Sequence, residues 1–279
     1  MKSLIGEVLV NEATLGGKYG SIMELAAKHC ATANNWRLAS KLLNKVPSPR
    51  SYDAYHAVLA SCGRAGNTDL ALEVFGALKA DGHTPNRASY NALLHATSAA
   101  GNLEAARNVL DEMTSAGVRL NVVTYNIALN SRARAGDARG AVNLLAEMEA
   151  GGIAPSVISF ATAINAAAHF NSSALASTLL NAMEPAGVAP NAYVFTAALA
   201  ACENDPDDSA AATTAQEVMN KMAACVKSGT SDLDKDLVQR AASQAKRLLA
   251  RDPSARNMLQ TREDELLLGI QLTGRQTAV

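Results

Sequence analysis

The sequence has none of the patterns that mark the common enzyme classes or a membrane protein. Its 279 residues contain no apolar stretch that reaches the roughly 18 uncharged residues of a membrane span. It has no glycine-rich phosphate loop, and none of its five histidines belongs to the His-x-Glu and Cys-x-x-Cys combination of a zinc deaminase. The spaced aspartates of a metal-dependent nuclease are also missing. We therefore expect a soluble protein that is not an enzyme and needs no cofactor or metal ion.

Cysteine is scarce and lacks the spacing of a metal site. We expect the cysteines to be small core residues, in a protein that resides in a reducing compartment. There are four of them: Cys30, Cys62, Cys202 and Cys225.

An excess of positive charge, which a nucleic-acid-binding protein uses to neutralise phosphates, is missing as well. The chain has 25 lysines and arginines against 26 aspartates and glutamates, which gives a net charge of −1. The charge is unevenly distributed. Residues 1–51 have seven basic against three acidic residues, or +4, whereas residues 52–191 have eight against eleven, or −3. One face of the protein can therefore be basic although the whole is not.

What the chain does have is a period of thirty-five residues. Aromatic rings recur in this register at Tyr55, Tyr90, Tyr125, Phe160 and Phe195. The same period fixes a glycine in the middle of the first three units, at Gly66, Gly101 and Gly136, and another near the end of the first four, at Gly82, Gly117, Gly152 and Gly187. Repeats of this length cannot bury their apolar faces alone and must stack on their neighbours. The units are 52–86, 87–121, 122–156, 157–191 and an irregular fifth, 192–230.

Each unit has the pattern of two short helices. In the second unit, apolar residues recur at helical spacing at Leu93 and Leu94 and again at Ala106, Val109 and Met113, and a glycine separates the two groups. At the end of most units glycine ends the second helix, proline prevents its continuation, and Asn or Ser can cap the next helix. The sequence therefore predicts an all-α fold, an α-solenoid of helical hairpins. The alternation of strands and helices that a β-containing fold requires is absent.

The two ends of the chain differ from the regular units. Residues 1–51 contain two apolar segments, with Asn34 in the place of the turn glycine, and we interpret them as a degenerate repeat. The fifth unit gains about four residues at 204–208, where we interpret the acidic residues as a solvent-facing loop rather than a cation site. We expect residues 231–279 to form a helical cap or tail. In this interpretation 231–250 pack on the repeats, and 254–272 dock on a partner protein.

Residues 122–156 resemble a pentatricopeptide repeat. The resemblance rests on Tyr125-Asn126 near the start, Ala135-Gly136-Asp137 at the turn, Met148 and the closing residues 152–156, and it extends over about 52–222. The related tetratricopeptide repeat has 34 residues and favours Trp and Leu-Gly early in its first helix, which none of these units has. The resemblance implies a short P-type array, a right-handed superhelix, and binding of single-stranded RNA at one base per repeat.

The resemblance also implies which residues contact the RNA. A base is read by the fifth residue of a unit together with its last, and the second residue stacks on the base. The pairs are His56 with Asn86, Asn91 with Asn121, Asn126 with Ser156, and Ala161 with Asn191, while Thr196 has no assignable partner. Val123, Ile158 and Tyr193 are the stacking candidates, and Arg64, Arg134 and His169 share a position where phosphate is bound.

These assignments differ in what they imply for the RNA. The pairs Asn91/Asn121 and Asn126/Ser156 resemble readers of cytidine that tolerate uridine, so the expected partner contains C or U. Ala161 cannot hydrogen-bond a base. A structural alternative exists for two classes of residue: Asn91 and Asn126 can be helix caps, and the two arginines can be surface charges favoured by the helix dipole.

Two functions remain open at this stage. The first is single-stranded RNA binding in the processing, stabilisation or translation of an organellar transcript. The second is a structural role in an organellar ribonucleoprotein such as a mitoribosome, with contacts to ribosomal RNA or protein partners and little sequence reading. The resemblance implies a mitochondrion or chloroplast as the location. The N-terminus, with Glu7, Glu12 and little arginine, does not itself resemble a transit peptide.

Overall fold

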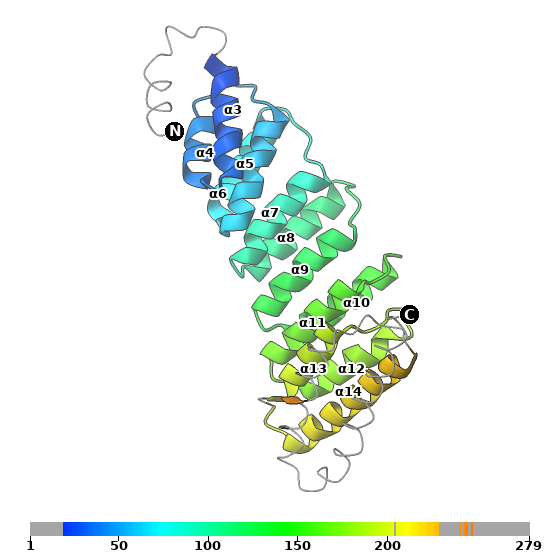
Figure 1. Cartoon of the computed structure of the whole chain (residues 1–279). Helices are drawn as coiled ribbons and strands as arrows, with labels where there is room; N and C mark the ends of the chain where they lie inside the picture. The colour runs from blue at the N-terminus through cyan, green and yellow to red at the C-terminus, as the bar shows by residue number, and fades with distance from the viewer. Residues whose placement is uncertain (1–18, 204, 229–239, 241–242, 245–246, 248–279) are drawn as a thin grey trace, which may run out of the picture. The chain divides into compact units, whose positions relative to one another are not determined.

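The computed structural model describes residues 19–203, 205–228, 240, 243–244 and 247, and within these residues the chain is helical and contains no strand (Figure 1). The chain divides into two compact units, Met1–Ser131 and Arg132–Val279, and the division lies inside helix α9. No helix among the described residues is long and apolar enough to cross a membrane.

The helices follow one another in pairs. The first unit contains α3 (Tyr19–Thr32), α4 (Trp36–Leu43), α5 (Tyr52–Ala65), α6 (Thr68–Ala80), α7 (Arg87–Ala99), α8 (Leu103–Ser115) and most of α9 (Val122–Arg134). The second contains the end of α9, α10 (Ala138–Ala150), α11 (Val157–His169), α12 (Ser173–Met183), α13 (Ala192–Glu203) and α14 (Asp208–Ser228).

Each unit is built as two layers of helices. The first helices of successive repeats pack side by side, as α3, α5 and α7 do in the first unit and α11 and α13 in the second (Figure 1). The second helices α4, α6 and α12 each pack on their own first helix and on the next one, as α6 does on α5 and α7. This arrangement is an all-α solenoid of helical hairpins, as the sequence predicts.

In the first hairpin and in the four regular repeats, the inner turn ends the first helix with a left-handed residue. Gly66, Gly101 and Gly136 have φ angles of +66°, +71° and +68°. Asn34 and Asn171 take the same position in two other repeats, with φ of +59° and +52°. Asparagine tolerates this conformation better than most residues do. The closing glycines Gly82, Gly117, Gly152 and Gly187 are left-handed as well, so both predicted turns are confirmed.

The core contains the residues that the period predicts. The five periodic aromatic rings are all buried, and so are the late second-helix residues Leu78, Met113, Met148 and Met183. Cys30, Cys62 and Cys202 are buried and Cys225 is half-buried, and none of the four forms a disulfide. Burial raises the pKa of the Cys62 thiol to about 11 and that of Cys202 to about 12. The predicted core role of these two cysteines is confirmed.

Asp81 fixes the linker between the first hairpin and α5. Its carboxylate accepts hydrogen bonds from Ser48 Oγ at 2.6 Å, from the backbone N–H of Arg50 at 3.0 Å and from the Tyr55 hydroxyl at 2.7 Å. The Arg50 guanidinium also donates to the Tyr55 hydroxyl at 2.8 Å. These bonds, led by the one from Ser48, lower the pKa of Asp81 to about 2. The hairpin α3–α4 is therefore held on the repeat that follows it.

The irregular fifth repeat keeps the core pattern after its extra residues. Val218 and Met222 are fully buried, as predicted. The acidic loop binds backbone, because Asp205 accepts from the N–H groups of Ser173 at 2.7 Å and Asp207 at 3.0 Å. Among the described residues no group of His, Cys, Asp and Glu could hold a metal ion.

Almost all of the predicted C-terminal cap and tail, 231–279, lies outside the described residues. Within this segment the Gln244 side chain donates to Glu203 Oε1, at the end of α13, at 3.0 Å.

Candidate nucleic-acid interface

The second residue of each first helix points into solvent. Val123, Ile158 and Tyr193 are 55%, 65% and 54% exposed, and they are three of the six large apolar side chains that are exposed in the described part of the chain. The next residue of each helix is fully buried. Water-exposed apolar side chains gain nothing from packing, so their recurrence at one register position favours contact with a ligand. These are the three residues that the sequence predicts to stack on bases.

Three side chains of the first unit meet at Thr124. The Thr124 hydroxyl oxygen lies 2.8 Å from Asn91 Oδ1 and 2.9 Å from Asn121 Oδ1, and the Thr124 backbone N–H donates to Asn121 Oδ1 at 3.0 Å. A hydroxyl carries one hydrogen, so the two asparagines share it. Thr124 is fully buried, whereas both asparagines are half-buried. The predicted reader pair Asn91/Asn121 is therefore brought together, beside the exposed Val123.

The bonds at Thr124 determine which atoms of the two asparagines remain available. All of them use the amide oxygens, and within the described residues neither Nδ2 group has a hydrogen-bond partner. Each Nδ2 group carries two hydrogens. The pair can therefore offer N–H donors to a ligand that lies against Val123.

The last residue of each of the repeats 52–86, 122–156 and 157–191 caps the first helix of the next repeat. Asn86 accepts from the N–H groups of Ala88 at 2.8 Å and Ser89 at 3.2 Å, and Ser89 reciprocates as a capping box. Ser156 forms the same motif at the start of α11, and Asn191 accepts from Val194 N at 3.0 Å. Asn91 lies one turn inside α7 and does not cap it. The cap alternative for Asn91 is therefore wrong, because the register assigns that role to Asn86.

The other predicted reader positions differ in chemistry. The His56 ring stacks on Tyr52, with ring centroids 6.4 Å apart and an interplanar angle of 12°. Ala161 is buried, and the Thr196 hydroxyl donates to the carbonyl of Tyr193 at 2.9 Å. Asn126 lies in the first unit and Ser156 in the second, so their mutual geometry is not described. Asn91/Asn121 is the pair that the structure defines.

The predicted phosphate-binding residues lie at the ends of the first helices. Arg64 donates through Nη2 to the carbonyl of Ala31 at 2.7 Å, and its Nε lies 3.4 Å from Asn34 Oδ1. It therefore satisfies a carbonyl at the C-terminus of α3, which favours the structural alternative for this residue. Arg134 is the last residue of α9 and His169 the last of α11, and both side chains are exposed.

Two contacts of the first-helix face were not predicted from the sequence. Lys28 Nζ lies 3.8 Å from Asp53 Oδ2, so a cation accompanies the acid that occupies the second position of α5. Asn165 donates to the Tyr193 hydroxyl at 2.6 Å and so restrains the ring. Lys28 and Asn165 both lie two turns into a first helix. A search for polar residues at this register position could have found them.

Comparison with known proteins agrees with these observations. Residues 85–134 and 120–169 match the PPR repeat family, and residues 51–102 match a pentatricopeptide repeat domain. No match was found among curated protein sequences.

Three solved structures resemble the chain in fold. The pentatricopeptide repeat protein PPR10 from maize superposes with a TM-score of 0.61 and 20% identity, over 92% of this chain and 38% of that one. PPR10 in complex with an 18-nt psaJ RNA element gives 0.59 and 21%, over 93% and 34%. The PPR domain of Arabidopsis thaliana protein-only RNase P 1, in complex with tRNA, gives 0.51 and 19%, over 67% and 95%.

The chain spans about a third of the length of PPR10. At these identities the likeness concerns the fold. The sequence matches over 51–169, together with the left-handed glycines Gly82, Gly117 and Gly152 that close these hairpins, identify this part of the chain as an array of pentatricopeptide repeats.

Proposed function

We propose that this protein binds single-stranded RNA on the exposed face of its first helices, with bases stacked on the second-position side chains. The observation that carries the proposal is the cluster at Thr124, where two reader asparagines are held together beside the exposed Val123. Stacking of a base on an apolar side chain is tolerant of sequence, whereas hydrogen bonds to its edge select it. The cluster supplies both kinds of contact.

The chemistry of this cluster favours cytidine. Because the amide oxygens of Asn91 and Asn121 face Thr124, the pair offers N–H donors. The Watson–Crick edge of cytosine has two adjacent acceptors, N3 and O2, whereas uracil has a donor at N3. We extend the assignment to Asn126/Ser156 as a second cytidine reader, so the preferred site contains two adjacent cytidines, with uridine tolerated.

The biological setting is proposed on the family relationship. In the similar structures, PPR10 is bound to a psaJ RNA element and the PPR domain of protein-only RNase P 1 to tRNA. These complexes support an RNA partner for the present chain. We propose a role without catalysis, in the processing, stabilisation or translation of a transcript in a mitochondrion or chloroplast.

A scaffold role in an organellar ribonucleoprotein is the second candidate. It is favoured by Ala161, which offers no group to a base, and by Arg64, whose guanidinium binds Ala31 and Asn34. The net charge of −1 favours it too. In that role the same face would contact ribosomal RNA or a protein with little dependence on sequence.

Fluorescence anisotropy with the full chain separates the two candidates. We compare a single-stranded RNA that has two adjacent cytidines in an adenosine-rich context with the same strand carrying adenosines there. We expect Asn91→Ala to reduce the preference for the cytidine strand by about 1 to 3 kcal/mol, by analogy with bidentate base contacts.

Asn108→Ala, at an exposed asparagine of the second helix α8, is the matched control and should leave the preference unchanged. Equal affinity of the wild-type protein for both strands would reject cytidine reading and favour the scaffold role.

A further inference from the structure

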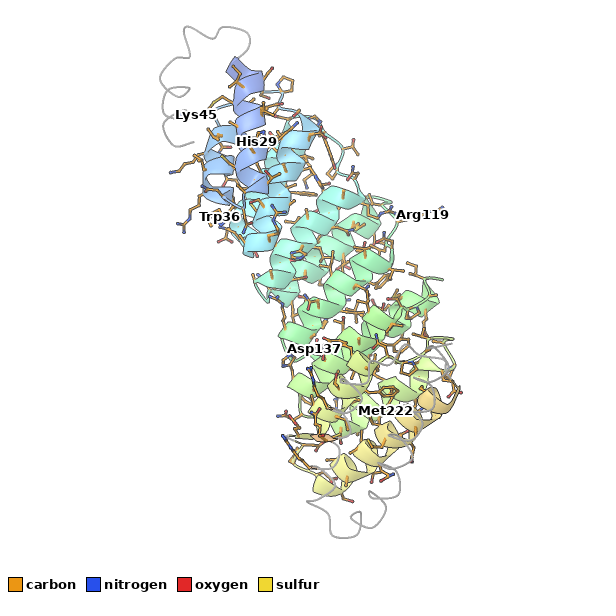
Figure 2. The ribbon with its side chains drawn as sticks, viewed as in Figure 1. His29, Trp36, Lys45, Arg119, Asp137 and Met222 are labelled. Atoms are coloured by element: carbon orange, nitrogen blue, oxygen red, sulfur yellow. The ribbon has the colours of Figure 1, made fainter. Side chains whose placement is uncertain are left out.

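The outer side of α4 carries a row of three cations. Arg37, Lys41 and Lys45 follow one another at intervals of four residues, which on a helix corresponds to a rise of about 6 Å per step. All three are exposed, and none takes part in an ion pair within the part of the chain that the structure describes. The Arg37 guanidinium lies over the half-exposed ring of Trp36, 4.9 Å from its centroid. We name these four residues the α4 basic face; Trp36 and Lys45 mark its two ends (Figure 2).

The equivalent surface of the next two repeats is acidic. Asn34 and Gly66 are both left-handed, and each lies two residues before its helix, α4 or α6. When these two residues and the buried residues of the two helices are matched, α4 aligns with α6 at an offset of 32 residues. The counterparts of Arg37, Lys41 and Lys45 are then Asp69, Glu73 and Ala77 on α6, and Glu104, Asn108 and Glu112 on α8. The charge at these positions changes from +3 on α4 to −2 on α6 and −2 on α8. Positive charge is therefore concentrated on one helix of the first unit.

A favourable interaction with the dipole of α4 explains the positions of only two of these three cations. Lys41 lies in the last turn of α4 and Lys45 just beyond it, where the helix dipole favours cations. Arg37 lies in the first turn, where the dipole disfavours a cation, and this turn of α4 contains no acidic residue. The first turns of α6 and α8 carry Asp69 and Glu104 instead. Arg37 is thus placed against the local electrostatic preference of α4, and its alignment with Lys41 and Lys45 in one row of exposed cations points to a partner outside the helix.

We propose that the α4 basic face binds the sugar-phosphate backbone of RNA, at a surface separate from the first-helix face. The inference rests on the proposed function, because it concerns the RNA that flanks the single-stranded segment. Three exposed cations, one of which lies over an indole ring, suit phosphate contacts. The surroundings are polar, with Asn34, Asn35 and Asn44 all exposed.

Two other kinds of partner fit this surface less well. A stable protein interface needs a buried apolar centre, and apart from the edge of Trp36 this face has none. An anionic membrane binds an amphipathic helix through its apolar side, but Ala39, Leu42 and Leu43 of α4 are already buried in the repeat.

The test uses the full chain and two fluorescent RNAs. One is the single strand with two adjacent cytidines, and the other is that strand extended by a stable hairpin. We expect the hairpin to increase the affinity of the wild-type protein. Three phosphate contacts should also steepen the slope of log K against log salt by about 2 to 3, which corresponds to roughly 40-fold between 50 and 200 mM salt.

The variant R37E/K41E/K45E should lose the hairpin-dependent gain and keep its affinity for the single strand. The matched control R107E/R119E/R139E reverses the same number of exposed charges elsewhere and should keep the gain. Circular dichroism checks the fold of both variants, and R37Q/K41Q/K45Q provides a milder second test. We expect it to lose most of the gain.

Specific outcomes would overturn the proposal. They are a wild-type protein that gains nothing from the hairpin, an equal loss in the two reversed variants, or an unchanged gain in R37E/K41E/K45E. If that variant bound RNA normally but lost affinity for polyglutamate, the face would be assigned to an acidic protein. Failure of the proposed function has a different result: the wild-type protein would then show no preference for cytidine in the single strand, and this measurement does not depend on α4.

Discussion

Asp81 joins the first hairpin to the repeat that follows it, and the effect of Asp81→Asn on stability can be worked out from its surroundings. The Asp81 side chain is 9% exposed and accepts hydrogen bonds from Ser48, Arg50 and Tyr55. Asparagine keeps the size of the side chain but removes its charge and one acceptor oxygen. Charge-assisted hydrogen bonds are the stronger ones, so the loss should be measurable.

The pKa of Asp81 sets the magnitude. It is lowered from 3.8 to about 2, first by the hydrogen bond from Ser48 and then by those from Arg50 and Tyr55. A shift of one unit corresponds to about 1.4 kcal/mol, so the charged form contributes about 2 kcal/mol to folding. Because the folded-state pKa is depressed, this contribution is present above the unfolded-state pKa and is lost as the pH falls toward the folded-state value.

Chemical denaturation followed by circular dichroism tests this prediction. At neutral pH we expect Asp81→Asn to lower the free energy of unfolding of the first unit by about 2 kcal/mol. The difference from wild type should shrink between about pH 4 and pH 2. Asp111→Asn is the control. Asp111 is exposed, its Oδ2 lies 3.9 Å from Arg107 Nε, and such exposed ion pairs contribute little to the free energy of unfolding. The reasoning is refuted if the two variants behave alike, or if the effect of Asp81→Asn does not depend on pH.

Three further substitutions test individual contacts. Thr124→Val removes the hydroxyl that holds the two reader asparagines and should reduce the preference for cytidine over adenosine, as measured by anisotropy; an unchanged preference would show that the hydroxyl has no part in it. Tyr193→Ala should weaken RNA binding by about 1 to 3 kcal/mol. Tyr193→Phe should keep the stacking and lose only the hydrogen bond from Asn165. An equal loss of RNA affinity in the two variants would argue against stacking. Gly66→Ala, at φ +66°, should lower the midpoint of thermal unfolding, whereas Gly76→Ala in α6, where an added Cβ meets nothing within 4 Å, should not; a similar loss in both would contradict the conformational argument.

The fold could be predicted from the sequence because both the buried aromatic residues and the turn residues recur from one repeat to the next. A ring at Tyr55, Tyr90 or Phe160 is buried because its helix packs on the neighbouring repeat, and a residue that tolerates a left-handed backbone, such as Gly66 or Asn171, stands where the chain turns inside a repeat. A period of thirty-five residues therefore fixes the architecture without knowledge of any single contact. The period places the second-position side chains at one register position, whereas the stacking role proposed for them is implied by the resemblance to pentatricopeptide repeats.

The details of the site depend on contacts between repeats, which the period does not contain. Asn91 meets Thr124 across 33 positions, and Arg64 binds the backbone carbonyl of Ala31, an acceptor that every residue possesses and no sequence pattern marks. The sequence alone leaves a cap role open for Asn91, because helix boundaries predicted from sequence are uncertain by a few residues. One such shift decides whether an asparagine caps a helix or lies inside it.

Crosslinking shows whether RNA lies on the first helices of the repeats. The full chain is irradiated with the cytidine-containing single strand, and the crosslinked peptides are identified by mass spectrometry. We expect crosslinks in α7, α9, α11 and α13, centred on the second and fifth residues of each helix, and we expect an adenosine strand to compete poorly. Crosslinks confined to the second helices α6, α8 and α10 would contradict the account.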